Sequence, residues 1–123
     1  MDREKLFKKV LDCAFEVHTN LGPGLLECVY EECLMFELES AGLKVEKQKS
    51  LPLIYKGLVL VSRLRIDILV ENQIVVELKA VEELTDVHLA QTLTYLNLSG
   101  CKLALLANFN VAHLKNGIKR VIL

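Results

Sequence analysis

The sequence predicts an α/β fold with a mixed central sheet flanked by helices. Residues 3–20 and 25–41 place apolar side chains at helical spacing, whereas residues 65–80 alternate with the period of two that is typical of strands. A further helical stretch separates these strands from the apolar run at 102–107. A helix between two strands forms a crossover, so we expect that pair of strands to be parallel.

The first helix is expected over residues 3–20, and the Asn20–Gly24 segment, with two glycines around a proline, breaks it. The second helix is expected from Leu25 to Ala41. Near its start, Glu27 lies three residues before Tyr30 on one apolar stripe. Glu27 has two explanations, a favourable interaction with the helix dipole and a role in a site. The other acids of this helix, Glu31, Glu32, Glu37 and Glu39, are expected in solvent.

A basic connector is expected at Lys44–Lys49, followed by a short strand at Leu51–Tyr55 in which Pro52 indicates a sheet edge. A long strand is expected at Leu58–Val70. Its Arg63 and Arg65 alternate with Asp67 on one face; they are either solvated edge charges or phosphate contacts.

The next hairpin brings three ionisable residues together in one register only. A three-residue loop at Glu71–Gln73 places Asp67 opposite Glu77, on the face that also carries Lys79. A two-residue loop would place Asp67 opposite Leu78 and separate the residues. We predict the three-residue loop.

The third helix is expected from Thr85 to Leu98, with His88, Gln91 and Tyr95 on one stripe. His88 is either a hydrogen-bonded structural histidine or a ligand. The last strands are expected at Lys102–Ala107 and Ile118–Leu123.

The composition indicates one globular domain over residues 1–123. Hydrophobic residues make up 52% of the chain and charged residues 25%, and the net charge is −1. No apolar run approaches the length of a membrane span, the N-terminus is charged, and no cysteines form a C-x-x-C pair. We expect a cytoplasmic protein with four reduced thiols, which does not bind membranes. With so little charge, binding of nucleic acid would need a local basic patch.

Asp67, Glu77 and Lys79 form the pattern D-x₉-E-x-K. Two convergent carboxylates suit a hard divalent cation such as Mg²⁺, and a lysine beside them can orient an attacking water. The pattern by itself is loose and occurs by chance, but its strand–turn–strand context gives it more weight.

The segment Gly24-Leu-Leu-Glu27-Cys-Val-Tyr30 resembles the G-x-x-E-x-x-Y signature of the small GxxExxY proteins, which are grouped with the PD-(D/E)XK nuclease superfamily. The resemblance continues through Asp67, Glu77-Leu78-Lys79, His88-x-x-Gln91-x-x-x-Tyr95 and Ala107-Asn108-Phe109, and so covers nearly the whole chain. Ile66 stands where the superfamily's name has proline.

This resemblance implies a PD-(D/E)XK nuclease-like αβββαβ core. It implies metal ligation by Asp67, Glu77, the Leu78 carbonyl and Glu27, with Lys79 as the catalytic lysine. It places Gln91 beside the site, with Tyr30, His88 and Tyr95 around it.

The resulting expectation is a nuclease that uses Mg²⁺ or Mn²⁺ to hydrolyse phosphodiester bonds in nucleic acid and that acts as a homodimer. The alternative is a catalytically inactive nuclease-fold module that binds nucleic acid or a protein partner. The intact Asp67, Glu77 and Lys79 favour the first, and the weak overall charge favours the second.

Overall fold

The computed structural model describes residues 1–123, apart from the side chain of Ser62. Its elements are α1 (Arg3–Leu21), α2 (Glu27–Ser40), β1 (Val45–Tyr55), β2 (Leu58–Val70), β3 (Ile74–Lys79), α3 (Asp86–Ser99), β4 (Leu103–Asn108), the 3₁₀ turn η1 (Leu114–Asn116) and β5 (Ile118–Ile122). This order of helices and strands is the predicted one, and the predicted fold class is confirmed.

The strands form one mixed sheet in the order β1-β2-β3-β4-β5. Only β3 and β4 are parallel, as the crossover through α3 requires, and the other neighbours are antiparallel. The strand that contains Pro52 lies at the sheet edge, where the missing N–H is tolerated.

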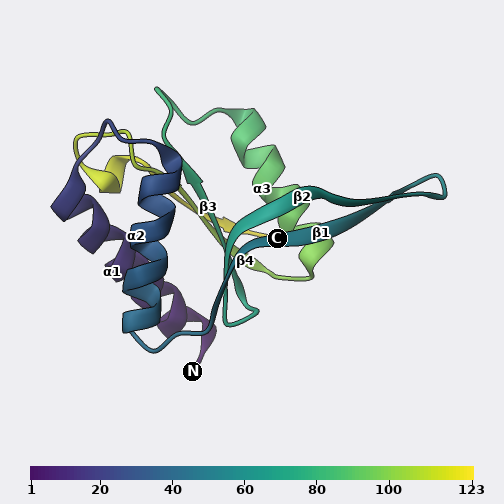
Figure 1. Cartoon of the computed structure of the whole chain (residues 1–123), viewed down its shortest axis with the longest axis horizontal. Coiled ribbons are helices and arrows are strands. Elements are labelled where there is room, and N and C mark those ends of the chain that lie inside the picture. Colours follow the sequence, from purple (N-terminus) through teal and green to yellow (C-terminus); the bar gives the residue numbers. More distant parts are fainter.

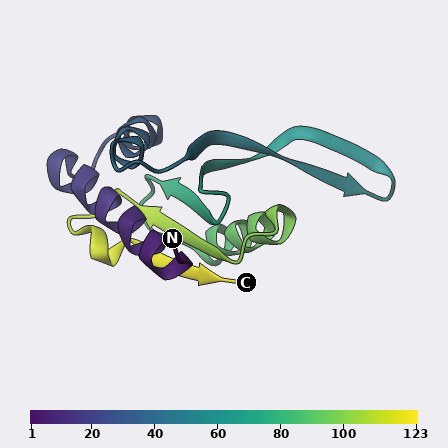
Figure 2. The ribbon, with the colours of Figure 1, turned by 90° about the horizontal axis from the view of Figure 1, so that it is seen from below.

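Helices cover both faces of the sheet (Figures 1 and 2). Side chains of α1 and α2 pack on one face, and Tyr95 and Leu96 of α3 pack on the other. Between these layers, every residue of β4 is buried, which agrees with its nearly continuous apolar sequence. No helix in the described part of the chain combines the length and apolarity needed to cross a membrane.

The basic connector predicted at Lys44–Lys49 is wrong, because β1 already begins at Val45. Lys47 and Lys49 pair with Ile68 and Ile66 of β2 through the backbone, and their side chains are exposed. An edge strand needs only one hydrogen-bonded neighbour and tolerates charged residues, so this strand lacks the apolar alternation from which strands are predicted.

Candidate active site at the fork of β2 and β3

The hairpin of β2 and β3 has the predicted register. Val70 pairs with Ile74, and Ile68 with Val76, which leaves a three-residue loop at 71–73. Two loop residues, Glu71 and Asn72, have positive φ angles of 52° and 55°. Continuing this register places Asp67 opposite Glu77, as expected from the alternation of the two strands.

The carboxylates of Asp67 and Glu77 occupy the point at which β2 and β3 separate, which we call the fork. The last backbone pair is Ile68–Val76. Beyond it, the backbone N–H of Asp67 donates to Glu77 Oε2 at 2.8 Å, and the backbone N–H of Leu78 donates to Asp67 Oδ2 at 2.8 Å. Each carboxylate therefore accepts the hydrogen bond that a strand carbonyl would otherwise accept. This reciprocal bonding fixes both carboxylates at the fork.

The fork holds more negative charge than its surroundings favour. Burial, assisted by the negative charge of Asp67, raises the pKa of Glu77 to about 8. Burial also raises the pKa of Asp67, although the Leu78 N–H and the Lys79 ammonium oppose that shift. Two carboxylates in such a place are stabilised by a proton or by a bound cation.

Lys79 and two residues of α3 extend the site. Lys79 Nζ donates to Gln91 Oε1 at 2.9 Å, and Gln91 Nε2 lies 3.3 Å from the Tyr95 hydroxyl. Burial raises the pKa of Tyr95, with further contributions from the charges of Glu77 and Asp67. The stripe predicted on the third helix thus brings Gln91 and Tyr95 beside the carboxylates.

Gln48 and Glu31 also belong to this site, and the sequence analysis missed both. Gln48 adopts a left-handed φ of 53°. Its amide donates to the two carboxylate oxygens of Glu31 at 3.1 and 3.0 Å and to Asp67 Oδ1 at 3.4 Å. The prediction that Glu31 is solvated is wrong, because it is only 9% exposed and burial raises its pKa. The sequence feature that could have identified Glu31 is its position, four residues after Glu27 and three before Leu34 on the same helix face.

Glu27 is the first residue of α2, and its side chain is exposed. The pKa of Glu77 is raised mainly by burial and by Asp67, and the charge of Glu27 adds a smaller contribution. Glu27 therefore lies within electrostatic range of the fork, but the buried acid on this helix is Glu31. The N-cap residue Leu26 forms no side-chain hydrogen bond, so an acid at this helix start also has the dipole explanation.

Tyr30 anchors the loop before α2. Its hydroxyl donates to the Gly22 carbonyl at 2.6 Å and accepts from the Leu25 N–H at 3.1 Å, and its ring stacks on Phe109. Gly24, at φ 97°, donates its N–H to Asn110 Oδ1. The glycine and tyrosine of the G-x-x-E-x-x-Y segment thus fix where α2 begins.

His88 takes the structural role that the sequence left open. Its Nδ1 accepts from the Thr85 N–H at 3.0 Å, while Thr85 caps the start of α3. This is a capping box in which histidine replaces the usual glutamate. These contacts explain His88 as part of the helix cap, and its expected place around the active site stays a prediction.

The donor set at the fork fits a hard divalent cation. Asp67 and Glu77 each use one oxygen for a backbone N–H, which leaves Glu77 Oε1 and Asp67 Oδ1, the latter with a 3.4 Å contact to Gln48, as ligand oxygens. Among the described residues, no three His, Cys, Asp or Glu side chains are close enough to hold a metal. A pair of carboxylates suffices for Mg²⁺, which retains several waters and also binds substrate phosphate.

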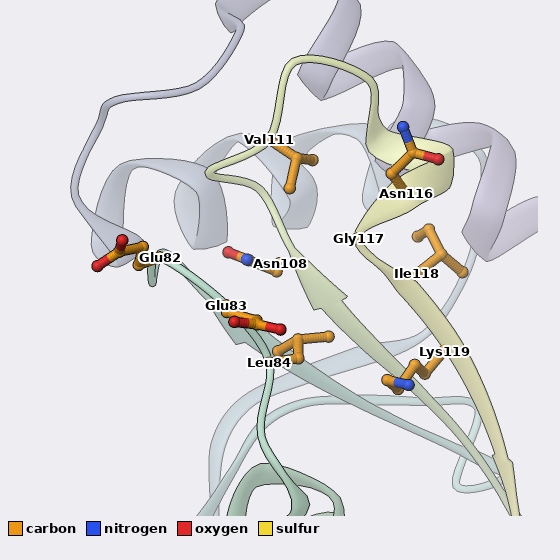
Figure 3. Close-up of a pocket in the computed structure, with 9 residues that line it drawn as sticks. All are labelled: Glu82, Glu83, Leu84, Asn108, Val111, Asn116, Gly117, Ile118 and Lys119. Atoms are coloured by element: carbon orange, nitrogen blue, oxygen red, sulfur yellow. The ribbon is translucent and has the colours of Figure 1, made fainter.

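A separate hollow of about 300 Å³ lies beside the C-terminal ends of β3 and β4. Figure 3 shows Asn108 in it, with Glu82 and Glu83 from the segment after β3 and Lys119 from β5. The buried Asn108 amide is already engaged, because Oδ1 accepts from Val81 N–H and Nδ2 donates to the Val81 carbonyl. Asn108 therefore holds the chain that follows Lys79, and it acts as a structural support for the site.

One comparison with known proteins gives a match. The model of a family described as the PD-(D/E)XK nuclease superfamily matches residues 4–121. No curated protein and no solved structure matches the chain. The match is to the superfamily, so the likeness to the GxxExxY group rests on the sequence motifs.

Proposed function

The chain belongs to the PD-(D/E)XK nuclease superfamily, and from this we propose that it hydrolyses phosphodiester bonds in nucleic acid with a divalent cation, Mg²⁺ or Mn²⁺. One observation carries the proposal. The fork between β2 and β3 holds Asp67 and Glu77 at the same point, with Lys79 two residues further along β3.

Asp67 and Glu77 would hold the cation, with the Leu78 carbonyl as a further oxygen ligand and Glu27 adding its charge. A bound divalent cation supplies charge neutralisation at the phosphate and lowers the pKa of water. Its charge would also offset the raised pKa of Glu77, because a nearby cation favours the ionised carboxylate. The buried fork thus suits an ion better than it suits two bare carboxylates.

Lys79 would hold the attacking water and stabilise the charge that develops on the phosphate. Gln91 accepts one hydrogen bond from the ammonium and so restricts where it points, leaving two N–H donors for water and phosphate. Tyr95 holds the other end of the Gln91 amide, and Gln48 with Glu31 holds the outer oxygen of Asp67. The chain's own residues therefore position the nucleophile before substrate arrives.

The test is cleavage of labelled DNA and RNA by the purified protein in Mg²⁺, in Mn²⁺ and in EDTA. We expect metal-dependent cleavage by the wild type and a loss of roughly 10²–10³-fold in Lys79→Ala, the range for removing one donor that stabilises developing charge. Lys79→Ala should still bind Mn²⁺. Asp67→Asn should lose both cleavage and metal binding, while its amide oxygen can still accept from the Leu78 N–H.

Equal cleavage by wild type and Lys79→Ala would place the activity at another site or in a contaminant. No cleavage by any form would favour the inactive binding module.

We also propose that the protein is a cytoplasmic homodimer. The four cysteines are all free, which is compatible with a reducing compartment. A twofold assembly would double the surface that contacts phosphates. Light scattering that shows only a monomer at micromolar concentration would contradict the dimer.

A further inference from the structure

The outer parts of β1 and β2 form an arm that projects beyond the helices (Figures 1 and 2). We define the arm as residues 47–65. Near its tip Leu53 pairs with Leu60, Ile54 with Val59 and Tyr55 with Leu58, and Lys56-Gly57 forms the turn. The arm starts at the active-site fork, because Lys47 pairs with the residue that follows Asp67.

The arm is the basic part of an otherwise acidic molecule. It contains five lysines and arginines, listed as Lys47, Lys49, Lys56, Arg63 and Arg65, and no aspartate or glutamate. The whole chain has a net charge of −1, so the residues outside the arm contain six more acids than bases. The small net charge of the whole chain therefore hides a local basic patch of the kind that binds polyanions.

Two of these cations lie on the strand that carries Asp67. Arg65 and Arg63 are two and four residues before Asp67 on β2. At a rise of about 3.3 Å per residue, the arginines stand roughly 7 and 13 Å from Asp67 along the strand. Both arginines are exposed, and the three ion pairs among the described residues involve neither.

Beyond the arginines, most side chains of the arm other than Lys56 are apolar. Near the tip, Ile54, Val59 and Val61 are 68%, 58% and 63% exposed. Tyr55 and Leu58 are exposed on the other face of the tip. Contiguous apolar surface of this kind marks an interaction site.

We propose that the arm is a nucleic-acid-binding ribbon that holds duplex substrate on one side of the scissile phosphate. Arg65 and Arg63 bind backbone phosphates next to the fork, and Ile54, Val59 and Val61 contact sugars and bases in the adjoining groove. A two-stranded ribbon fits the major groove of a duplex, where apolar side chains can contact the thymine methyl group. This inference rests on the proposed nuclease function, since it assigns the substrate class to the same site.

The experiment measures binding of a fluorescent DNA duplex by anisotropy in EDTA, which removes divalent cations so that the duplex is not cleaved. We compare wild type with Arg63→Glu/Arg65→Glu and with Lys5→Glu/Lys9→Glu, which makes the same charge change on exposed residues of α1. The arm variant should bind on the order of tenfold more weakly or worse, and its slope of log Kd against log salt should fall by about 2, the value for two lost phosphate contacts. The α1 variant should match the wild type.

A second arm variant, Ile54→Ser/Val59→Ser, tests the apolar contacts. It should weaken duplex binding and leave the salt slope unchanged, because no charge is altered. Circular dichroism checks that both variants fold. Equal affinity in the Arg63/Arg65 and Lys5/Lys9 variants, or no duplex binding by wild type, would overturn the proposal.

Self-association is the competing use of this surface. If light scattering finds that Ile54→Ser/Val59→Ser turns a dimer into a monomer while duplex binding is unchanged, the arm binds a second copy and the proposal fails. The nuclease proposal and the arm proposal can be contradicted separately. Arm-dependent binding without any cleavage would refute the nuclease, whereas cleavage that is indifferent to the arm variants would refute the arm.

Discussion

Glu77 is held in a place that disfavours its charge. Its pKa is raised from 4.5 to about 8 by burial and by Asp67. Between these two pH values the folded metal-free protein keeps a proton that the unfolded chain has released. Its free energy of unfolding therefore falls as pH rises from about 4.5 to 8, at up to about 1.4 kcal/mol per pH unit.

Glu77→Gln should remove this dependence. Glutamine keeps an oxygen for the Asp67 N–H and carries no charge, so the variant should be a few kcal/mol more stable than wild type near pH 8 and similar near pH 4.5. Urea unfolding in EDTA at several pH values measures this, with exposed Glu39→Gln as the matched control. The same pH slope in wild type and Glu77→Gln would show that the carboxylate is not strained by its surroundings.

The sequence could predict that Asp67 and Glu77 meet, because strand alternation and the hairpin loop length fix their register. It could not predict the contribution of Gln48. That residue reaches both Glu31 and Asp67 only because its backbone is left-handed, which its side-chain type does not indicate. Glu31 was missed because its residue type is shared with the other acids of the helix, and its position on the apolar face was not weighed.

At the scale of elements, α3 carries two polar residues with different roles: one positions Lys79, and the other caps the helix. Gln91 holds the Lys79 ammonium, and His88 completes the helix cap. Gln91→Ala should lower kcat by about tenfold, the equivalent of roughly 1.4 kcal/mol for one lost charged hydrogen bond, with little change in stability.

His88→Ala is the matched comparison on the same helix. It should lower the free energy of unfolding by about 1 kcal/mol, as caps do, and leave kcat unchanged. Steady-state kinetics and urea unfolding of both variants measure the two effects. A loss of kcat in His88→Ala at unchanged stability would place His88 in the active site after all.

The order of elements was predictable because helical and strand periodicities differ plainly in this chain. The exception is the start of β1, where Lys44–Lys49 has no apolar alternation. Backbone pairing with β2 makes that segment a strand, and backbone hydrogen bonds leave no mark on the side-chain pattern.

At the scale of the whole molecule, charge and shape divide the protein into an acidic body and a basic arm. The sequence predicted β2 at its full length, Leu58–Val70, but it did not predict which part of the strand is exposed. Only the fold shows that the outer part of β2, still paired with β1, extends beyond the helices (Figure 1). Exposure depends on where the helices end in space and not on the strand's own residues.

The central claim is that the fork between β2 and β3 is a divalent-metal site. A crystal structure of the protein soaked in Mn²⁺, with an anomalous difference map, tests it most directly. The account predicts a peak in contact with the carboxylates of both Asp67 and Glu77, and no peak there in Asp67→Asn. A peak at another group of residues, or an empty fork at saturating Mn²⁺, would contradict it.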